Sequence, residues 1–481
     1  FALSLIPLVL VMVFTRTPIR PQILLVVFGV VCLAVLCLGV GLILAAVMVF
    51  FRDTQFIWGV LVTVLNFATP IFYPESIIPQ RFMTIYKMNP LYHMVRFMRI
   101  VLMDGISPEP KAYLLAGALS GHALLALSGG VDSSVAAYLL KKAGYDVIGV
   151  TMQIWQDEAE TVQEENGGCC GLSAVDDARR VAQVLDIPYY VMNFKKEFRE
   201  NVMDYFTNEY LCGRTPNPCI ACNRYVKWEA LLQRSLSIGA DYIATGHYAR
   251  IEQLANGRYA IANSVTAAKD QTYALYNLTQ EQLSHTLMPV GDYTKDQIRE
   301  IAAKIGLPVA KKKDSQEICF VPDQDYASFI QNETGIVAPK GNFVNTKGEI
   351  LGTHEGITHY TVGQRRGLGL PMGHRVFVLE IRPETNEVVV GENEEVFAKV
   401  VKANKVNYMA IPPLELGEEL SCTAKIRYGH KGSPCVIKRT GEDEITCTFP
   451  DGVRAPTPGQ AVVFYVDGCV GGGGTITEAE R

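Results

Sequence analysis

The sequence lacks a Walker A loop, since no Gly-Lys-Ser or Gly-Lys-Thr occurs among its 481 residues. This absence excludes the phosphate-binding loop of P-loop nucleoside triphosphatases. The net charge is only −5, so no overall basic character indicates nucleic-acid binding, and any RNA contact must come from a local patch. Twelve cysteines are too few for a disulfide scaffold in a chain of this length, and we expect them to be catalytic, metal-binding or inert.

The first 120 residues have almost no charge over two long stretches. No charged residue occurs from Pro21 through Phe51, which exceeds the roughly 20 apolar residues needed to cross a bilayer. A second uncharged run extends from Thr54 to Pro74, and residues 1–14 are typical of the end of another span. A buried soluble helix is the alternative, but two such runs side by side favour α-helical transmembrane segments.

Two short motifs follow these runs, Phe72-Tyr73-Pro74-Glu75 and Asn89-Pro90-Leu91-Tyr92-His93. With them, residues 1–120 resemble the C-terminal half of the permease subunit of ABC-2 type exporters. The resemblance implies membrane contact and, as an alternative function for the chain, a part in glycan export with a separate ATPase. Half a permease is not expected to transport. No polar linker follows it, which indicates that two unrelated reading frames have been joined.

The rest of the chain is organised around residues 128–134, Ser-Gly-Gly-Val-Asp-Ser-Ser. They lie between an apolar run, Ala123 to Leu127, and a helix-like pattern, Val135 to Leu140, which predicts strand, glycine turn and helix. Two glycines let the backbone approach a ligand, and the helix N-terminus then faces an anion. The pattern is typical of the loop that holds pyrophosphate when ATP is split to AMP; the alternative is an ordinary strand-to-helix turn.

Further apolar runs alternate with helical patterns. Val147–Met152, Tyr189–Phe194 and Asp241–Thr245 are predicted strands, and Asp176–Leu185 is a predicted amphipathic helix. This alternation predicts an α/β domain with a parallel sheet, in which ligands bind beyond the carboxyl ends of the strands.

Three cysteines lie in distinctive surroundings. Cys219 and Cys222 form a CxxC in residues 214–223, where two prolines and two asparagines predict a non-regular loop. Half a zinc site, a redox pair and a nucleophile with a neighbour all fit this spacing, although a zinc site needs about four ligands. Cys319 follows three lysines at 311–313, which would lower the pKa of a nearby thiol and attract phosphate, or form a solvated charge run.

Six motifs occur in an order that resembles the bacterial tRNA-specific 2-thiouridylases, from about residue 123 to about 478. They are SGGVDSS, TPNPCIACN, ATGHY, KDQTYAL, KKKDSQEICF and HYTVGQRRGLGL. The resemblance implies an enzyme that replaces O2 of the wobble uridine with sulfur in the tRNAs for Lys, Glu and Gln. ATP would adenylate that oxygen, and a persulfide sulfur would then attack the activated carbon.

The resemblance also implies a cofactor site for ATP with Mg²⁺ and a pair of catalytic thiols. Cys319 would take a persulfide from a sulfur-relay protein or a cysteine desulfurase, and Cys222 would free the sulfur by closing a disulfide with Cys319. Asp132 would assist through Mg²⁺. The implied ATP-binding residues are Ala126, Leu127, Ser128, Gly129, Gly130, Val131, Asp132, Ser133, Met152 and Gly246.

The tRNA is the implied macromolecular partner. Some family members have Asp where Cys219 stands, so an acid/base role is not implied at that position here. Three cysteines could instead hold an iron–sulfur cluster, and no other metal site is expected besides the Mg²⁺ that accompanies ATP. The residues implied at the target base are Asn217, Pro218 and Cys219, and those implied elsewhere on the tRNA are Lys269, Asp270, Gln271, Arg427 and Tyr428.

The expected organisation has four parts. They are a permease-like membrane segment over 1–120, an ATP-pyrophosphatase domain over 121–325, a small central α/β domain over 326–395 and a tRNA-contacting β-barrel over 396–481. The enzyme is expected in the cytoplasm, tethered to the membrane by the first part. A different enzyme on the same ATP-pyrophosphatase fold, such as a synthetase, is disfavoured by the CxxC and by Cys319.

Overall fold

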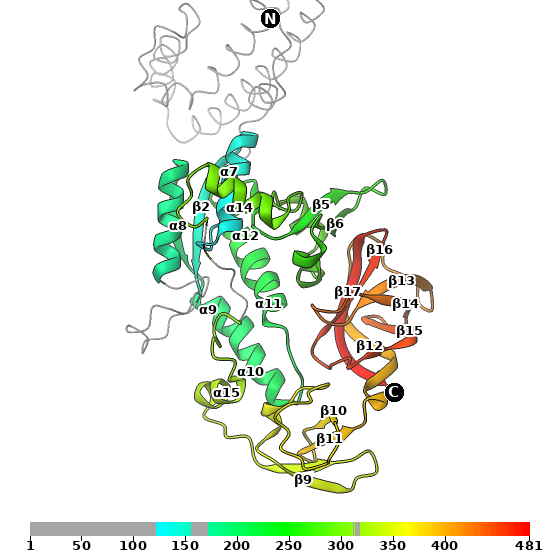
Figure 1. Cartoon of the computed structure of the whole chain (residues 1–481). Helices are drawn as coiled ribbons and strands as arrows, with labels where there is room; N and C mark the ends of the chain where they lie inside the picture. Colours follow the sequence, from blue (N-terminus) through cyan, green and yellow to red (C-terminus); the bar gives the residue numbers. More distant parts are fainter. Residues whose placement is uncertain (1–121, 155–171, 311, 313–317) are drawn as a thin grey trace, which may run out of the picture. The chain divides into compact units, whose positions relative to one another are not determined.

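The computed structural model describes residues 122–154, 172–310, 312 and 318–481 (Figure 1). The predicted membrane spans and the junction with the following domain lie outside these described residues. Within the described ranges, no helix combines the length and the apolar character needed to cross a bilayer.

The first domain is built on a parallel sheet of five strands, ordered β3-β2-β1-β4-β7, which confirms the predicted α/β class. Helices α7 (Val131–Ala143) and α8 (Leu172–Leu185) form the crossovers that lead from β1 to β2 and from β2 to β3. The five strands are β1 (His122–Ala126), β2 (Asp146–Gln153), β3 (Tyr189–Asn193), β4 (Tyr242–Ala244) and β7 (Thr286–Leu287).

The strand order reverses between β1 and β4. The chain moves from β1 through β2 to β3 on one side, and then returns to place β4 on the other side of β1. Ligands of open α/β sheets bind beyond the carboxyl ends of the strands at such a reversal. The glycine turn follows β1 and Thr245-Gly246-His247 follows β4, so these two segments border the expected crevice.

Two long helical stretches connect β3 to β4. The first is α9 (Lys195–Phe198), η5 (Arg199–Met203) and α10 (Asp204–Leu211), and the second is α11 (Pro218–Ala221), η6 (Cys222–Leu231) and α12 (Leu232–Ser237). The predicted non-regular loop over 214–223 is therefore wrong in its second half. Pro218 is the first helical residue, where its missing N–H costs nothing, and the Asn217 side chain caps the helix.

An aromatic cluster forms the core beneath these helices. Phe206 meets Phe320 edge to face, with ring centroids 5.3 Å apart, and Phe198 meets Phe320 at 5.6 Å. Helix α15 (Tyr326–Thr334) adds Tyr326 and Phe329 to the same cluster. Because Phe320 directly follows Cys319, the cluster anchors the third conspicuous cysteine to this core.

The central segment is a four-stranded mixed sheet, ordered β10-β11-β8-β9. Val388 and Val390 pack on one face of β11 and Val389 on the other, so the sheet is buried on both sides. The expected small α/β domain is thus mainly β, and α15 packs on the aromatic cluster as well as against the short helix η9 (Ile357–His359) of this segment. The strands are β8 (Gly341–Val344), β9 (Ile350–His354), β10 (Phe377–Arg382) and β11 (Glu387–Gly391).

The C-terminal strands form the predicted β-barrel, closed by pairing of β12 with both β15 and β17 (orange to red in Figure 1). A hairpin of the first domain, β5 (Ala249–Gln253) and β6 (Tyr259–Asn263), extends this sheet by pairing with β17. The barrel strands are β12 (Phe397–Tyr408), β13 (Glu419–Lys425), β14 (Ser433–Arg439), β15 (Glu444–Arg454), β16 (Ala461–Val466) and β17 (Cys469–Glu480).

Candidate active site

The glycine turn after β1 curls over the start of α7. Gly129 has a φ of +67°, and a Cβ there would lie 2.4 Å from the Ala174 carbonyl oxygen, so only glycine fits without strain. The Ser134 hydroxyl donates to the Gly130 carbonyl at 2.7 Å, and the Ser128 N–H donates to the Ser133 hydroxyl at 3.2 Å. These contacts fix the turn at the N-terminus of α7, and a helix N-terminus favours an anion.

The segment after β4 packs directly on this turn. A Cβ on Gly246 would lie 2.6 Å from the backbone nitrogen of Ser133. Two residues later, the Tyr248 hydroxyl donates to the Asp132 carboxylate at 2.7 Å. The structure therefore brings together Asp132 and Gly246, two residues predicted at the ATP site from distant motifs.

Asp132 is held by a lysine that belongs to none of the sequence motifs. The Lys295 ammonium lies 2.8 Å from both carboxylate oxygens of Asp132, and its side chain is only 11% exposed. Lys295 begins α14 (Lys295–Lys304), far from any of the recognised motifs. Both oxygens that would bind Mg²⁺ are thus already hydrogen-bonded, so Asp132 does not fit a directly bound Mg²⁺ in this arrangement.

A second lysine contacts the turn from the segment that precedes Cys319. The Lys312 ammonium donates to the Gly129 carbonyl at 3.2 Å and to the Asp177 carboxylate at 2.7 Å. The lysine run is therefore more than a solvated charge run at this position, although the neighbouring residues 311 and 313–317 lie outside the described part of the chain.

The two predicted catalytic thiols pack against one hydrophobic cluster. Cys222 begins η6 and Cys319 precedes Phe320, and both border the aromatic cluster from different segments. Cys219 is exposed one turn earlier, and all three thiols are unbridged. Among the described residues, no three His, Cys, Asp or Glu side chains are arranged to hold a metal ion. The disulfide between Cys222 and Cys319 stays a prediction.

Three residues predicted to contact tRNA gather near Tyr428, in the loop between β13 and β14. Burial raises the pKa of the Tyr428 hydroxyl, as do the nearby Asp270 and Cys219 charges, while Lys269 lowers it. The Tyr428 side chain is nonetheless 51% exposed and meets the ring of Tyr273 edge to face. An exposed, laterally supported aromatic ring beside a lysine suits a nucleobase. Arg427, the preceding residue, is also exposed.

Asp270 and Gln271 make contacts inside the chain. The Asp270 carboxylate, 6% exposed, accepts hydrogen bonds from Ser264 and from the N–H and hydroxyl of Thr272. The Gln271 side-chain oxygen accepts from the Tyr248 N–H at 2.9 Å. These two side chains shape the site, and their predicted contacts with tRNA remain predictions.

The loop before Cys219 is fixed by the barrel. The Thr215 N–H donates to the Pro458 carbonyl at 2.9 Å, and the Gln460 side chain donates to the carbonyls of Thr215 and Pro216. The Asn217 oxygen accepts from the N–H groups of Cys219 and Ile220, which leaves its predicted role at the base dependent on its amide nitrogen. No local sequence signal indicates Gln460, because it acts across more than 240 residues.

His247 is a neutral residue beside the crevice. Burial lowers its pKa well below 6.5, and the Lys227 ammonium lowers it further. Its Nδ1 lies 2.8 Å from the Thr245 hydroxyl and its ring packs near Trp228. It is therefore an uncharged hydrogen-bonding group at neutral pH.

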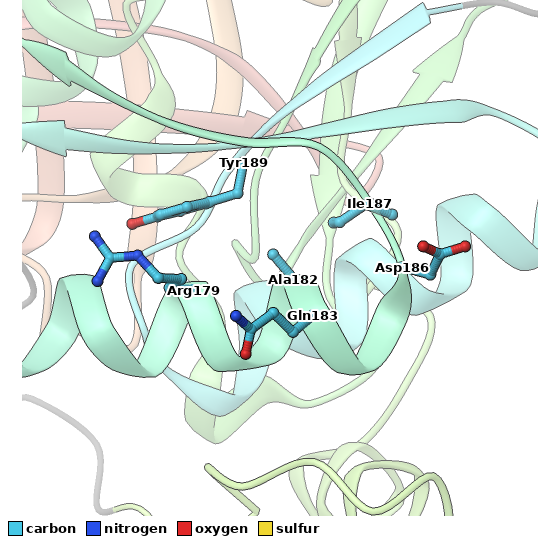
Figure 2. Close-up of a pocket in the computed structure, with 6 residues that line it drawn as sticks. All are labelled: Arg179, Ala182, Gln183, Asp186, Ile187 and Tyr189. Carbon is cyan, nitrogen blue, oxygen red and sulfur yellow. The ribbon is translucent and has the colours of Figure 1, made fainter.

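A cavity of about 470 Å³ opens between α8 and the start of β3, away from the carboxyl ends of the strands. Figure 2 shows Arg179 and Gln183 on the helix, with Tyr189 on the strand facing them. The Tyr189 hydroxyl lies 2.8 Å from that of Thr151, which donates to the Leu127 carbonyl. This chain of contacts supports the glycine turn from behind.

Comparison with known proteins assigns most of the described residues to family models. The matches are the tRNA methyl transferase HUP domain over 122–323, the tRNA methyl transferase PRC-barrel domain over 327–392 and the Aminomethyltransferase beta-barrel domain over 398–476. Residues 1–103 match the ABC-2 type transporter model.

The tRNA-specific 2-thiouridylase MnmA of Lachnoclostridium phytofermentans is 70% identical over 353 residues, which are 73% of this chain and 98% of that protein. The chain belongs to the tRNA-specific 2-thiouridylase family. The 2-thiouridylase of Clostridioides difficile is 55% identical over 74% of this chain and 98% of its own. A solved NMN synthetase from Francisella tularensis is 14% identical, covers 47% of this chain and 75% of its own, and has a TM-score of 0.26, a likeness too slight to bear on function.

The glycine turn and the CxxC helix both lie within residues 122–323, which match one family model. The loop that carries Tyr428 lies within residues 398–476, which match the separate barrel model.

Proposed function

We propose that residues 122–481 form an ATP-dependent tRNA sulfurtransferase that converts the wobble uridine of the tRNAs for Lys, Glu and Gln to 2-thiouridine. The observation that carries this proposal is the convergence of three segments on one domain. The glycine turn, the CxxC helix and the Cys319 segment are joined by the Lys312–Gly129 contact and by the aromatic cluster. Methyl transfer, named in two of the matching models, requires neither a pyrophosphate-type loop nor paired thiols.

In the proposed first step, the glycine turn binds ATP. The turn, Ala126 and Leu127 before it, and Val131 to Ser133 after it hold the phosphates, while Met152 and Gly246 flank the adenosine. The uridine O2 attacks the α-phosphorus, an O–P bond forms, and the bond to the pyrophosphate breaks. Mg²⁺ would neutralise phosphate charge when bound, but no step is assigned to it because the Asp132 oxygens are engaged by Lys295.

In the proposed second step, Cys319 carries a persulfide delivered by a sulfur-relay protein or a cysteine desulfurase. The terminal sulfur attacks C2 of the uridine, and AMP leaves with the original oxygen. The Cys222 thiolate then attacks the Cys319 sulfur, so a Cys222–Cys319 disulfide forms and the electron pair of the broken S–S bond stays on the new 2-thiouridine. An external thiol must reduce the disulfide before the next cycle.

The tRNA is proposed to lie across the first domain and the barrel. The target base would face Pro218, Cys219 and the amide of Asn217, and Lys269, Arg427 and Tyr428 would contact the tRNA. Support comes from Cys219 and Lys269, which lie close enough to Tyr428 for their charges to shift the pKa of its hydroxyl. Asp270 and Gln271 would act by holding Thr272 and Tyr248 in place. We place the domain limits at 121–325, 326–395 and 396–481, with the enzyme cytoplasmic and residues 1–120 as its membrane tether.

A reconstituted thiolation assay tests this function. The full chain, unmodified tRNA for Glu, ATP and a cysteine desulfurase with cysteine are mixed, and 2-thiouridine is measured by mass spectrometry of the digested tRNA. We expect one pyrophosphate released per thiouridine formed. Methylated uridine, or thiolation that does not need ATP, would contradict the proposal.

A further inference from the structure

We propose that Cys219 is a third redox thiol, which takes over the Cys222–Cys319 disulfide after each cycle and presents it to an external reductant. This inference deepens the proposed function and rests on it, because that disulfide is a product of the proposed second step. The reductant is a dithiol, either a small molecule or a protein that carries one.

The three thiols differ in how accessible they are. Cys222 and Cys319 are half-buried, and both pack against the aromatic cluster around Phe206 and Phe320. Cys219 is exposed. Thiol–disulfide exchange requires direct access of the attacking thiolate to a sulfur atom. A disulfide between the two half-buried cysteines is therefore shielded from a protein reductant, whereas a disulfide that includes Cys219 can be attacked from solvent.

The start of the CxxC helix places Cys219 and Cys222 on the same side. Both lie in continuous helical backbone, and the Cys222 N–H donates to the carbonyls of Cys219 and Pro218. Residues three apart on a helix share one face, with Cα atoms about 5 Å apart. A disulfide spans Cα separations of roughly 4.4–6.8 Å, so these two thiols can be bridged without unwinding the helix.

The first turn of this helix can adjust to the bridge. The Asn217 side-chain oxygen accepts hydrogen bonds from the Cys219 N–H at 3.1 Å and from the Ile220 N–H at 3.2 Å. The N–H groups of a first turn have no partner within the helix, and here the cap supplies one. A small rotation at Cys219 therefore leaves the hydrogen bonds of the following turns in place.

The exchange begins when the 2-thiouridine has left. The Cys219 thiol releases its proton to water, and the thiolate attacks the Cys222 sulfur. The Cys219–Cys222 bond forms, the Cys222–Cys319 bond breaks, and its electron pair stays on the Cys319 sulfur, which takes up a proton. The external dithiol then attacks the Cys219 sulfur, so that Cys222 leaves and takes up a proton. The second thiol of the reductant closes its own disulfide and releases Cys219.

Disulfide mapping after a single turnover tests the exchange. The full chain is loaded with persulfide by a cysteine desulfurase, freed of cysteine by gel filtration, and mixed with equimolar tRNA for Glu and ATP. Free thiols are then alkylated and the tryptic digest is analysed by mass spectrometry. Cys219 and Cys222 lie on one tryptic peptide, residues 215–224, so their bridge appears as an unalkylated peptide lighter by two hydrogens. We expect this bridge in the wild-type chain, with Cys319 alkylated, and a Cys222–Cys319 bridge in Cys219→Ser.

Turnover with a protein dithiol gives a second readout. An internal thiol acts at a millimolar effective concentration and a protein reductant at a micromolar one, so Cys219→Ser should lower the steady-state rate at least about tenfold and the first turnover less than about threefold. A small phosphine reductant, which can reach a half-buried sulfur, should restore most of the steady-state loss. Cys212→Ser, at an exposed cysteine outside the CxxC, is the matched control and should keep both rates.

Three results would overturn the inference. They are a Cys222–Cys319 bridge that persists in the wild-type chain, equal losses of first turnover and steady-state rate in Cys219→Ser, and iron with sulfide bound to the chain purified without oxygen. In the last case the three thiolates would be metal ligands and not exchange partners. A wild-type chain that forms no 2-thiouridine in the first turnover would instead overturn the proposed function.

Discussion

Replacing Asp270 by alanine should mainly lower the stability of the folded protein and should have a smaller direct effect on tRNA binding. The carboxylate accepts from the Ser264 N–H at 2.9 Å, the Thr272 N–H at 3.2 Å and the Thr272 hydroxyl at 2.5 Å. Hydrogen bonds to a charged acceptor contribute about 1.5–3 kcal/mol each and are not additive. Thr272 is fully buried, so its N–H would lose its partner without access to water, while its hydroxyl would keep the Tyr465 hydroxyl at 3.1 Å. We therefore expect the free energy of unfolding to fall by about 3 kcal/mol.

The assay measures urea unfolding by tryptophan fluorescence and tRNA affinity by filter binding on the same samples. A chain of several domains need not unfold in two states, so the shift of the unfolding midpoint is the quantity compared. Lys269→Met is the matched control, because it removes the neighbouring charge on the side that faces Tyr428. We expect the control to weaken tRNA binding and to leave the midpoint nearly unchanged. An unchanged midpoint for Asp270→Ala, with tRNA binding lost, would refute the reasoning and restore the expectation drawn from the sequence.

Three further predictions concern the site. Cys222→Ser and Cys319→Ser should each abolish thiolation, while Cys212→Ser, at an exposed cysteine outside the CxxC, should keep it; full activity of both single variants in the tRNA mass assay would rule out the thiol pair. Gly246→Ala should weaken ATP binding at least tenfold, because its Cβ would meet the Ser133 nitrogen at 2.6 Å; titration with ATP measures this. His247 has a folded pKa below its unfolded value of 6.5, so its contribution to stability is full above about pH 6.5 and is lost as the pH falls toward the folded pKa. His247→Gln should therefore flatten the decline in thermal stability below pH 6.5, and an identical decline in both proteins would contradict that assignment.

Local patterns were sufficient to predict the parallel sheet and the glycine turn. Strands β1 and β2 are short apolar runs bounded by polar residues. The turn needs a glycine where φ is +67°, and the sequence shows a glycine at that position, Gly129. The barrel was predicted for a similar reason, since its strands are separated by glycine and proline turns. The CxxC helix does not follow from composition, because asparagine and proline are typical of loops, although Asn217 followed by Pro218 is also a common helix start.

The contacts that complete the site could not be predicted, because they join residues distant in sequence. Lys295 meets Asp132 across 163 residues, and Gln460 holds the loop at Thr215 across 245. Neither belongs to a motif with a recognisable spacing. The burial of Asp270 was equally hidden, since a charged residue in a polar stretch such as Lys-Asp-Gln is normally exposed.

The hairpin β5–β6 has a practical consequence for engineering this enzyme. It leaves the first domain and pairs with β17 at Ala262 and Cys469, and Trp228, Tyr273 and Val463 share one core across the same border. Deleting the barrel would therefore expose a strand edge and part of a core. A chimaera that takes its barrel from another protein would also need that protein's counterpart of residues 249–263.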